Sequence, residues 1–192
     1  MQIGRNFTRT LAKTLGNAYN MGMKFMIASD LHGSEKWTGK LLDAFERERA
    51  ELLVLLGDLY YHGVRNPLPE GYAPLGVANL LNAHKERLLV LRGNCDSEVD
   101  LCVSEFPTVQ NARLFADGRH FYFCHGHNEC FEHPPALPAG SAFCQGHTHV
   151  AVCEKHGDLF FLNPGSVSLP KGGTPRGFAL VSDGEICLKR LE

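Results

Sequence analysis

Side chains that commonly bind divalent metal ions occur in this sequence directly after short apolar runs. The runs are typical of buried strands, and each is followed by aspartate, asparagine or histidine. The residues concerned are Asp30, His32, Asp58, Asn94, His125, His147 and His149. Each group adjoins a glycine, which permits tight turns and close approach of the backbone to a ligand. Because imidazole nitrogens with carboxylate and amide oxygens form a mixed ligand set, the sequence predicts a transition-metal site.

The number of candidate ligands predicts two metal ions rather than one. Seven side chains exceed what a single ion binds while it also keeps room for water and substrate. Asp58 stands alone after its apolar run and is the candidate bridge. The other candidates include two pairs whose side chains point to the same side of an extended chain, Asp30 with His32 and His147 with His149. Two cations about 3.5 to 4 Å apart lower the pKa of a bridging water and stabilise a phosphoryl group, which suits hydrolysis of phosphate esters.

An alternation of strands and helices must position these side chains. The first half of the chain has a strand–helix–strand–helix–strand pattern, which predicts a parallel sheet with helices on its faces. The expected strands are 24–28, 52–56 and 88–91, and the expected helices are 35–49 and 73–85. In an open α/β sheet, ligands bind beyond the carboxyl ends of the strands, so side chains that follow successive strands are expected to converge.

The second half of the chain is expected to be richer in strands. A short helix is expected first, at 97–104, with Asp96 or Ser97 as its N-cap; Asp96 could equally be a partner of the metal ligands. Strands are then expected at 119–124, 141–144, 151–154, 159–162, 177–182 and 186–191. Asp183-Gly184 is a strong hairpin signal between the last two. The whole pattern predicts an α/β sandwich.

Length and composition limit the classes of protein. A chain of 192 residues with 44% hydrophobic residues suits one core, so a single domain is expected over 23–192. Residues 1–22 are basic and amphipathic without a long apolar segment, which indicates an N-terminal extension or a misassigned start. The net charge of −2 offers no basic face for nucleic acid, and no apolar run reaches the ~20 residues of a membrane span. Seven cysteines without a CxxC pair favour a reducing, cytoplasmic location.

Five short motifs, in order along the chain, carry a resemblance to a known family. They are Asp30-Leu-His32, Gly57-Asp58, Gly93-Asn-Cys-Asp96, His125-Gly-His127 and Gly146-His-Thr-His149, followed by Asn163-Pro-Gly-Ser-Val167. From Met23 to the C-terminus the chain resembles the calcineurin-like metallophosphoesterase superfamily, and within it the YfcE-type bacterial phosphodiesterases. The resemblance implies a four-layer α/β/β/α sandwich of two mixed β-sheets, the metallo-dependent phosphatase fold. It also implies that Asp30, His32, Asp58 and His149 hold one metal, and that Asp58, Asn94, His125 and His147 hold the other.

The expected function is hydrolysis of small phosphodiesters by attack of a metal-bridging hydroxide, with Asp58, Asn94 and His125 as catalytic residues. Two Mn²⁺ ions are the first choice of cofactor, and Fe²⁺, Ni²⁺ and Zn²⁺ are the alternatives. Many family members have histidine where this chain has Cys95, and a thiol is a poorer acid toward a leaving group. The residues expected to face the substrate are His62, Cys95, His127 and Lys171, with Arg65 as a further cation that could meet the phosphate.

Two other functions stay open from the sequence. A phosphomonoesterase or nucleotidase would use the same ligands, whereas a non-catalytic binding scaffold, such as the retromer subunit with this fold, would have a degraded ligand set. None of the seven ligand positions is replaced here, which favours an enzyme. The expected partner is a small phosphoester, without a stable nucleic-acid or membrane partner. A homo-oligomer is compatible with apolar loop residues, namely Tyr60, Tyr61, Leu68 and Tyr72.

Overall fold

The computed structural model describes residues 22–192, so the predicted N-terminal extension lies outside the described residues except for Gly22. The helices and strands, in chain order, are β1 (Phe25–Ala28), α2 (Glu35–Glu48), β2 (Leu52–Leu55), α3 (Pro74–Asn82), η1 (Lys85–Arg87), β3 (Leu88–Leu91), η2 (Val99–Cys102), β4 (Thr108–Val109), β5 (Asn111–Ala116), β6 (Arg119–Cys124), β7 (Ala142–Cys144), β8 (Val152–His156), β9 (Leu159–Asn163), β10 (Gly177–Ser182) and β11 (Glu185–Arg190). None of the helices in this part of the chain is long and apolar enough to span a membrane.

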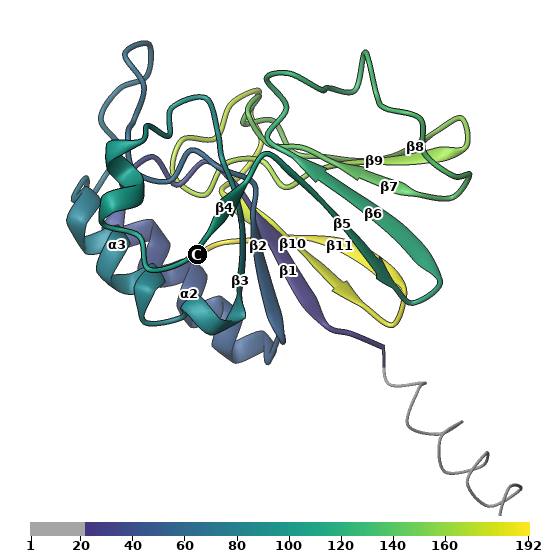
Figure 1. The fold of residues 1–192 in the computed structure, drawn as a ribbon, viewed down its shortest axis with the longest axis horizontal. Helices are drawn as coiled ribbons and strands as arrows, with labels where there is room; N and C mark the ends of the chain where they lie inside the picture. Colours follow the sequence, from purple (N-terminus) through teal and green to yellow (C-terminus); the bar gives the residue numbers. More distant parts are fainter. Residues whose placement is uncertain (1–21) are drawn as a thin grey trace, which may run out of the picture.

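The first sheet is mixed and has the strand order β11-β10-β1-β2-β3-β4. Strands β1, β2 and β3 run parallel, and β10 pairs antiparallel with β1. Helices α2 and α3 lie side by side on one face of this sheet (Figure 1). In β1, Met26 and Ala28 pack toward these helices, whereas Phe25 and Ile27 pack toward the second sheet. This alternation follows from the two-residue period of a strand, and it buries both faces of the sheet.

Helix α2 illustrates how local sequence sets the boundaries of an element. Ser34 is its N-cap, and the hydroxyl oxygen accepts a hydrogen bond from the Trp37 N–H at 3.3 Å. The helix ends at Glu48, and its C-cap Arg49 adopts the left-handed conformation with a φ of 54°. Between these ends, Leu41 and Phe45 lie four residues apart on the buried face. The loop before the helix is thereby held against the first sheet, where it carries two of the candidate ligands.

The second sheet is also mixed, with the order β5-β6-β7-β9-β8. It packs against the first sheet through large buried side chains, such as Phe121 and Phe123 of β6, with Phe25 of β1 edge-on to Phe121. Its outer face carries Phe143 and Phe161, and the irregular segment 125–141 covers this face by way of Phe131 and Leu137. The predicted class, an α/β sandwich of two mixed sheets, is confirmed, with helices on the first sheet and an irregular layer on the second (Figure 1).

Three element predictions need correction. The helix expected at 73–85 ends at Asn82, and the next residues form the short helix η1. The helix expected at 97–104 is only the 3-10 turn η2. Strands β4 and β5 were not predicted, because β5 exposes alternate residues at the edge of its sheet and therefore has no continuous apolar run.

Candidate metal centre

The candidate ligands lie in the loops that follow five strands, beyond the carboxyl ends of these strands. Asp30 follows β1, Asp58 follows β2 and Asn94 follows β3. His125 follows β6, and the His147–His149 pair follows β7. Because β1, β2 and β3 are parallel to one another and β6 is parallel to β7, these carboxyl ends meet where the two sheets face each other.

Five of these residues have a left-handed backbone, a conformation that residues other than glycine adopt uncommonly. They are Asp30 (φ 58°), His32 (φ 47°), Asp58 (φ 56°), His147 (φ 66°) and His149 (φ 61°). Hydrogen bonds between neighbouring turns maintain this conformation, from the Asp30 N–H to the Gly57 carbonyl at 3.1 Å and from the His32 N–H to the Asp58 carbonyl at 2.9 Å. Gly93 allows the turn after β3 to lie against the turn after β2, because a Cβ at this position would overlap the backbone nitrogen and Oδ1 of Asp58. The strained turns thus aim several side chains at one point.

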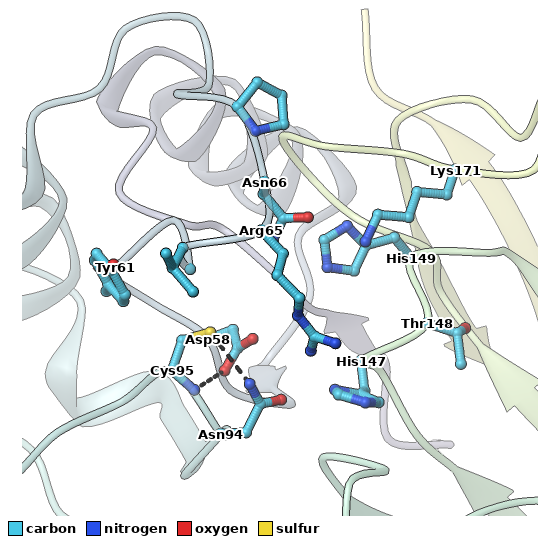
Figure 2. A pocket seen from close by; sticks show the side chains of 13 residues that line it. Asp58, Tyr61, Arg65, Asn66, Asn94, Cys95, His147, Thr148, His149 and Lys171 are labelled. Atoms are coloured by element: carbon cyan, nitrogen blue, oxygen red, sulfur yellow. Dashed lines mark hydrogen bonds between the residues drawn. The ribbon is translucent and has the colours of Figure 1, made fainter.

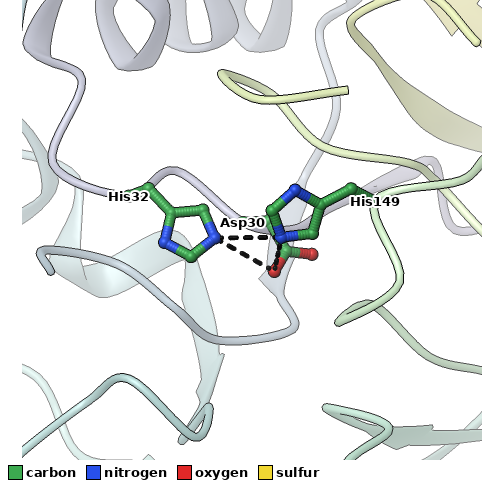
Figure 3. Close-up of side chains that lie close together, drawn as sticks. All are labelled: Asp30, His32 and His149. Carbon is green, nitrogen blue, oxygen red and sulfur yellow. Dashed lines mark hydrogen bonds and ion pairs between the residues drawn. The ribbon is translucent and has the colours of Figure 1, made fainter. Parts of the chain in front are cut away.

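The first cluster consists of Asp30, His32 and His149, all buried (Figure 3). His32 Nδ1 lies 2.8 Å from the Tyr61 carbonyl, and His149 Nδ1 lies 2.6 Å from the Leu169 carbonyl. Each ring therefore donates through Nδ1 and directs the lone pair of Nε2 inward. The two Nε2 atoms face each other at 3.1 Å, and Asp30 Oδ1 lies 3.3 Å from His149 Nε2 without a hydrogen-bond donor. Such an arrangement of acceptors fits a cation placed between them.

The second cluster is built around His125. Its Nδ1 lies 2.8 Å from the Leu56 carbonyl, so its Nε2 lone pair also points inward. Nε2 lies 2.9 Å from Asn94 Oδ1 and 3.5 Å from Asp58 Oδ1. Here again the facing atoms can share either a proton or a metal ion. His147 lies beside this second cluster. Its ring is edge-on to the His125 ring, with centroids 5.1 Å apart, and its backbone N–H donates to Asp30 Oδ2 at 3.0 Å.

The Asp58 carboxylate lies between the two clusters. Its Oδ2 is 3.7 Å from His32 Nε2 of the first cluster, and its Oδ1 faces His125 of the second. The Cys95 N–H donates to Asp58 Oδ1 at 2.8 Å, which fixes the orientation of the carboxylate. The position expected for a bridging ligand is therefore the one that Asp58 occupies.

The ionisation of the centre favours binding of cations. Burial alone would raise the pKa of Asp30, but the neighbouring His149, His32 and His125 side chains hold that pKa well below its usual range. Burial opposes the charged form of His125 as well, yet the Asp58 and Asp30 carboxylates raise its pKa to about 9. Both carboxylates are anionic at neutral pH, and the imidazoles compensate that charge by attracting protons, for which a metal ion can substitute.

Asp96 is a residue whose role the sequence left open between a helix cap and a partner of the ligands. Its carboxylate accepts hydrogen bonds from the backbone N–H groups of Asp58 (2.8 Å), Leu59 (2.7 Å) and Gly93 (2.7 Å). Asp96 therefore joins the turn that carries Asp58 to the turn that carries Asn94. The sequence signal was its place two residues after Asn94, in the same motif.

The segment 163–168 also supports the centre, a role that the sequence did not assign to individual residues. The hydroxyls of Ser166 and Ser168 donate to the Asp30 carbonyl at 2.7 and 3.2 Å. The Asn163 side-chain amide donates to the Gly146 carbonyl at 2.8 Å. Asn163 and the serines thus connect the loop after β7 to the loop after β1.

A pocket of about 730 Å³ opens beside the two clusters (Figure 2). Its lining includes Asp58, Asn94, His147 and His149 together with Tyr61, Val64, Arg65, Pro67, Cys95, Thr148 and Lys171. Figure 2 shows the Arg65 guanidinium between Asn94 and His147, and the Lys171 side chain extending over His149. Cys95 and Lys171, two of the residues expected to face the substrate, line this pocket.

The other two residues expected to face the substrate lie outside this pocket lining. The His62 ring packs edge-on between Tyr61 and Tyr72, at centroid distances of 4.7 and 5.4 Å. His127 lies beside His125, with ring centroids 5.3 Å apart, and lines a smaller pocket of about 240 Å³. The sequence spacing could not separate these histidines from the others, because all of them lie in loops after strands.

Comparisons with known proteins agree with this geometry. Residues 23–183 match the model of the calcineurin-like phosphoesterase superfamily domain. Phosphodiesterase YfcE of Escherichia coli strain K12 is 44% identical over 162 residues, which cover 84% of this chain and 88% of that protein.

Among solved structures, YfcE, described as a phosphoesterase from E. coli, superposes with a TM-score of 0.87 at 41% identity over 88% of this chain and 94% of that one. Vacuolar protein sorting 29 of Cryptosporidium parvum, at 15% identity and a TM-score of 0.58 over 88% and 96% of the two chains, shares the fold alone. This chain belongs to the calcineurin-like phosphoesterase superfamily.

Proposed function

We propose that this protein is a phosphodiesterase that hydrolyses small phosphodiesters with two divalent metal ions. One observation carries the proposal: inward-facing Nε2 and carboxylate atoms form two clusters that share Asp58. The 44% identity to a protein named phosphodiesterase supports the choice of a diester. Asp30, His32, Asp58 and His149 would hold one ion, and Asp58, Asn94, His125 and His147 would hold the other.

The chemistry follows from the ligands and from the side chains around them. When bound, two divalent ions lower the pKa of a water molecule and offset charge on the phosphoryl group. The chain itself contributes Arg65, whose guanidinium points to the space between Asn94 and His147 and can bind a phosphate oxygen there (Figure 2).

The leaving-group side of the reaction has a weak acid. Burial and the nearby Asp58 carboxylate raise the pKa of the Cys95 thiol to about 12. A thiol with this pKa transfers its proton poorly at neutral pH. We therefore infer that the enzyme prefers esters whose leaving group departs without protonation, such as aryl phosphodiesters, over alkyl phosphomonoesters.

Mn²⁺ is the metal that we propose. The ligand set contains three oxygen donors, from Asp30, Asp58 and Asn94, beside imidazole nitrogens, and such mixed sites accept Mn²⁺ readily. We also propose a cytoplasmic location, which the seven free cysteines support, because thiols persist in a reducing compartment.

The test is turnover of bis(4-nitrophenyl) phosphate and of 4-nitrophenyl phosphate by protein that has been stripped of metal and reconstituted with Mn²⁺. Turnover of the diester should require metal, and Asp58→Asn and His147→Ala should each reduce kcat/KM at least 100-fold, since a missing ligand disturbs both ions. Matched controls are Asp43→Asn and His120→Ala, the same substitutions at exposed positions outside the centre. Full turnover by verified metal-free protein would contradict the proposal. A protein that holds two ions per chain but cleaves neither ester would instead favour a binding scaffold.

A further inference from the structure

The 730 Å³ pocket has two chemically different walls. One wall is formed by the loop after β2 and carries Tyr61, Val64 and Pro67, with Tyr61 43% and Val64 87% exposed; Arg65 and Asn66 of the same loop line the pocket beside them. The opposite wall is formed by the loops after β7 and β9 and carries Thr148 and Lys171 (Figure 2). The first wall suits a flat, apolar group, and the second suits an anion. The two ester arms of a bound diester would therefore meet different surroundings.

The position of Lys171 in this wall is fixed by its backbone. The Lys171 N–H donates to the His149 carbonyl at 3.0 Å. The Thr174 N–H and hydroxyl both donate to the Lys171 carbonyl, at 3.0 and 2.8 Å. The lysine therefore has a defined place one hydrogen bond from a candidate metal ligand, and Figure 2 shows its side chain directed over that ligand.

Neither pocket cation is neutralised by a carboxylate of the described residues. Lys171 and Arg65 form no ion pair within residues 22–192, whereas four other lysines and arginines do, namely Lys24, Lys36, Lys85 and Arg87. Among the described residues that line the pocket, Asp58 is the only acidic one. Positive charge is thus left available at the place where a substrate enters.

The charge balance of the centre shows why one phosphodiester does not account for both cations. The candidate ligands include two carboxylates, Asp30 and Asp58, so two divalent ions leave two positive charges uncompensated. One diester charge and the charge of an ionised water cancel these two. Neither Arg65 nor Lys171 then has a counter-charge. Arg65 lies where it can share the scissile phosphate, as proposed above, whereas Lys171 lies over His149 on the other wall.

We infer that Lys171 is a specificity-determining residue that binds a second phosphate group, carried on one arm of the substrate. The substrate class is accordingly small phosphodiesters with one flat, apolar arm and one arm that bears a further phosphate. This inference rests on the proposed phosphodiesterase function. It assigns to Lys171 a different role from that of Arg65, which meets the phosphate that is cleaved.

A matched pair of substrates tests the inference. Thymidine 5′-(4-nitrophenyl phosphate) and its 3′-phosphorylated counterpart release the same leaving group and differ only in the second phosphate. We expect the 3′-phosphorylated probe to have the higher kcat/KM, and Lys171→Met to lower the ratio of the two values by roughly fivefold or more, as expected for one partly exposed charge contact. Lys155→Met, which removes an exposed lysine of β8, should leave the ratio unchanged and controls for net charge.

Equilibrium binding gives a second measurement that does not depend on turnover. In titration calorimetry with the reconstituted protein, thymidine 3′,5′-bisphosphate should bind more tightly than thymidine 5′-monophosphate, and Lys171→Met should remove most of the difference. Equal ratios in wild type, Lys171→Met and Lys155→Met would overturn the inference while leaving the phosphodiesterase function intact. If wild type with metal cleaves neither diester, the proposed function fails, and the inference fails with it.

Discussion

Replacing Asp96 by asparagine tests how the two ligand-bearing turns are held together. The carboxylate accepts three backbone hydrogen bonds, from Asp58 at 2.8 Å, Leu59 at 2.7 Å and Gly93 at 2.7 Å. An asparagine side chain has one acceptor oxygen, and its NH₂ group would face at least one of these N–H donors. A hydrogen bond to a charged group contributes about 1.5 to 3 kcal/mol, so loss of at least one bond and the donor–donor contact should cost about 3 kcal/mol.

The cost can be measured by thermal unfolding. For a chain of this length, about 1 kcal/mol corresponds to roughly 2 to 4 °C in Tm, so Asp96→Asn should lower Tm by roughly 6 to 12 °C. Because the same turns aim Asp58 and Asn94, Mn²⁺ affinity measured by calorimetry should fall about 10- to 100-fold.

Asp100→Asn is the matched control for this experiment. Asp100 accepts from the Ser97 N–H at 2.7 Å and from the Ser97 hydroxyl at 2.9 Å, on the exposed surface and away from the centre. Its replacement should cost about 1 kcal/mol and leave metal affinity unchanged. If Asp96→Asn changes Tm and metal affinity no more than Asp100→Asn does, the assigned role of Asp96 is refuted.

Three further predictions concern the centre. Gly93→Ala should abolish Mn²⁺ binding in calorimetry, because the added Cβ would overlap Asp58. Gly39→Ala, in helix α2 where a Cβ meets nothing within 4 Å, is the control and should bind metal normally. In chelator-treated protein, the folded state raises the pKa of His125 from 6.5 to about 9, so protonation of His125 stabilises the fold. This contribution to the free energy of unfolding is fully present below pH 6.5 and is lost as the pH rises through about 9, so Tm should fall over that range. With Mn²⁺ the trend should reverse, because the ion needs deprotonated ligands, and parallel Tm curves would contradict this. Cys95→His should increase turnover of esters with poor leaving groups more than that of bis(4-nitrophenyl) phosphate, since imidazole is a stronger acid than this thiol; an equal change for both would exclude Cys95 from the leaving-group side.

Some of the fold was predictable because its signals are local. Strands β1, β2 and β3 are continuous apolar runs, as strands buried on both faces must be, and their alternation with helices implies parallel pairing. The Asp183-Gly184 turn marked the hairpin of β10 and β11. Asp117-Gly118 carries the same signal between β5 and β6, with φ values of 50° and 75°, but β5 was missed because its exposed residues break the apolar pattern.

The sequence by itself determined the kind of chemistry, because ligand-type residues after successive strands are a local pattern whose meaning depends on little else. Only the tertiary structure decided how these residues cooperate. The left-handed turns, the backbone carbonyls that orient His32, His125 and His149, and the three amides on Asp96 join segments far apart in the chain. Only the tertiary structure also decided that Lys171 and Cys95 line the pocket beside the centre, whereas His62 and His127 do not. Which side chains share a pocket depends on how the loops pack against each other, and no local pattern records that packing.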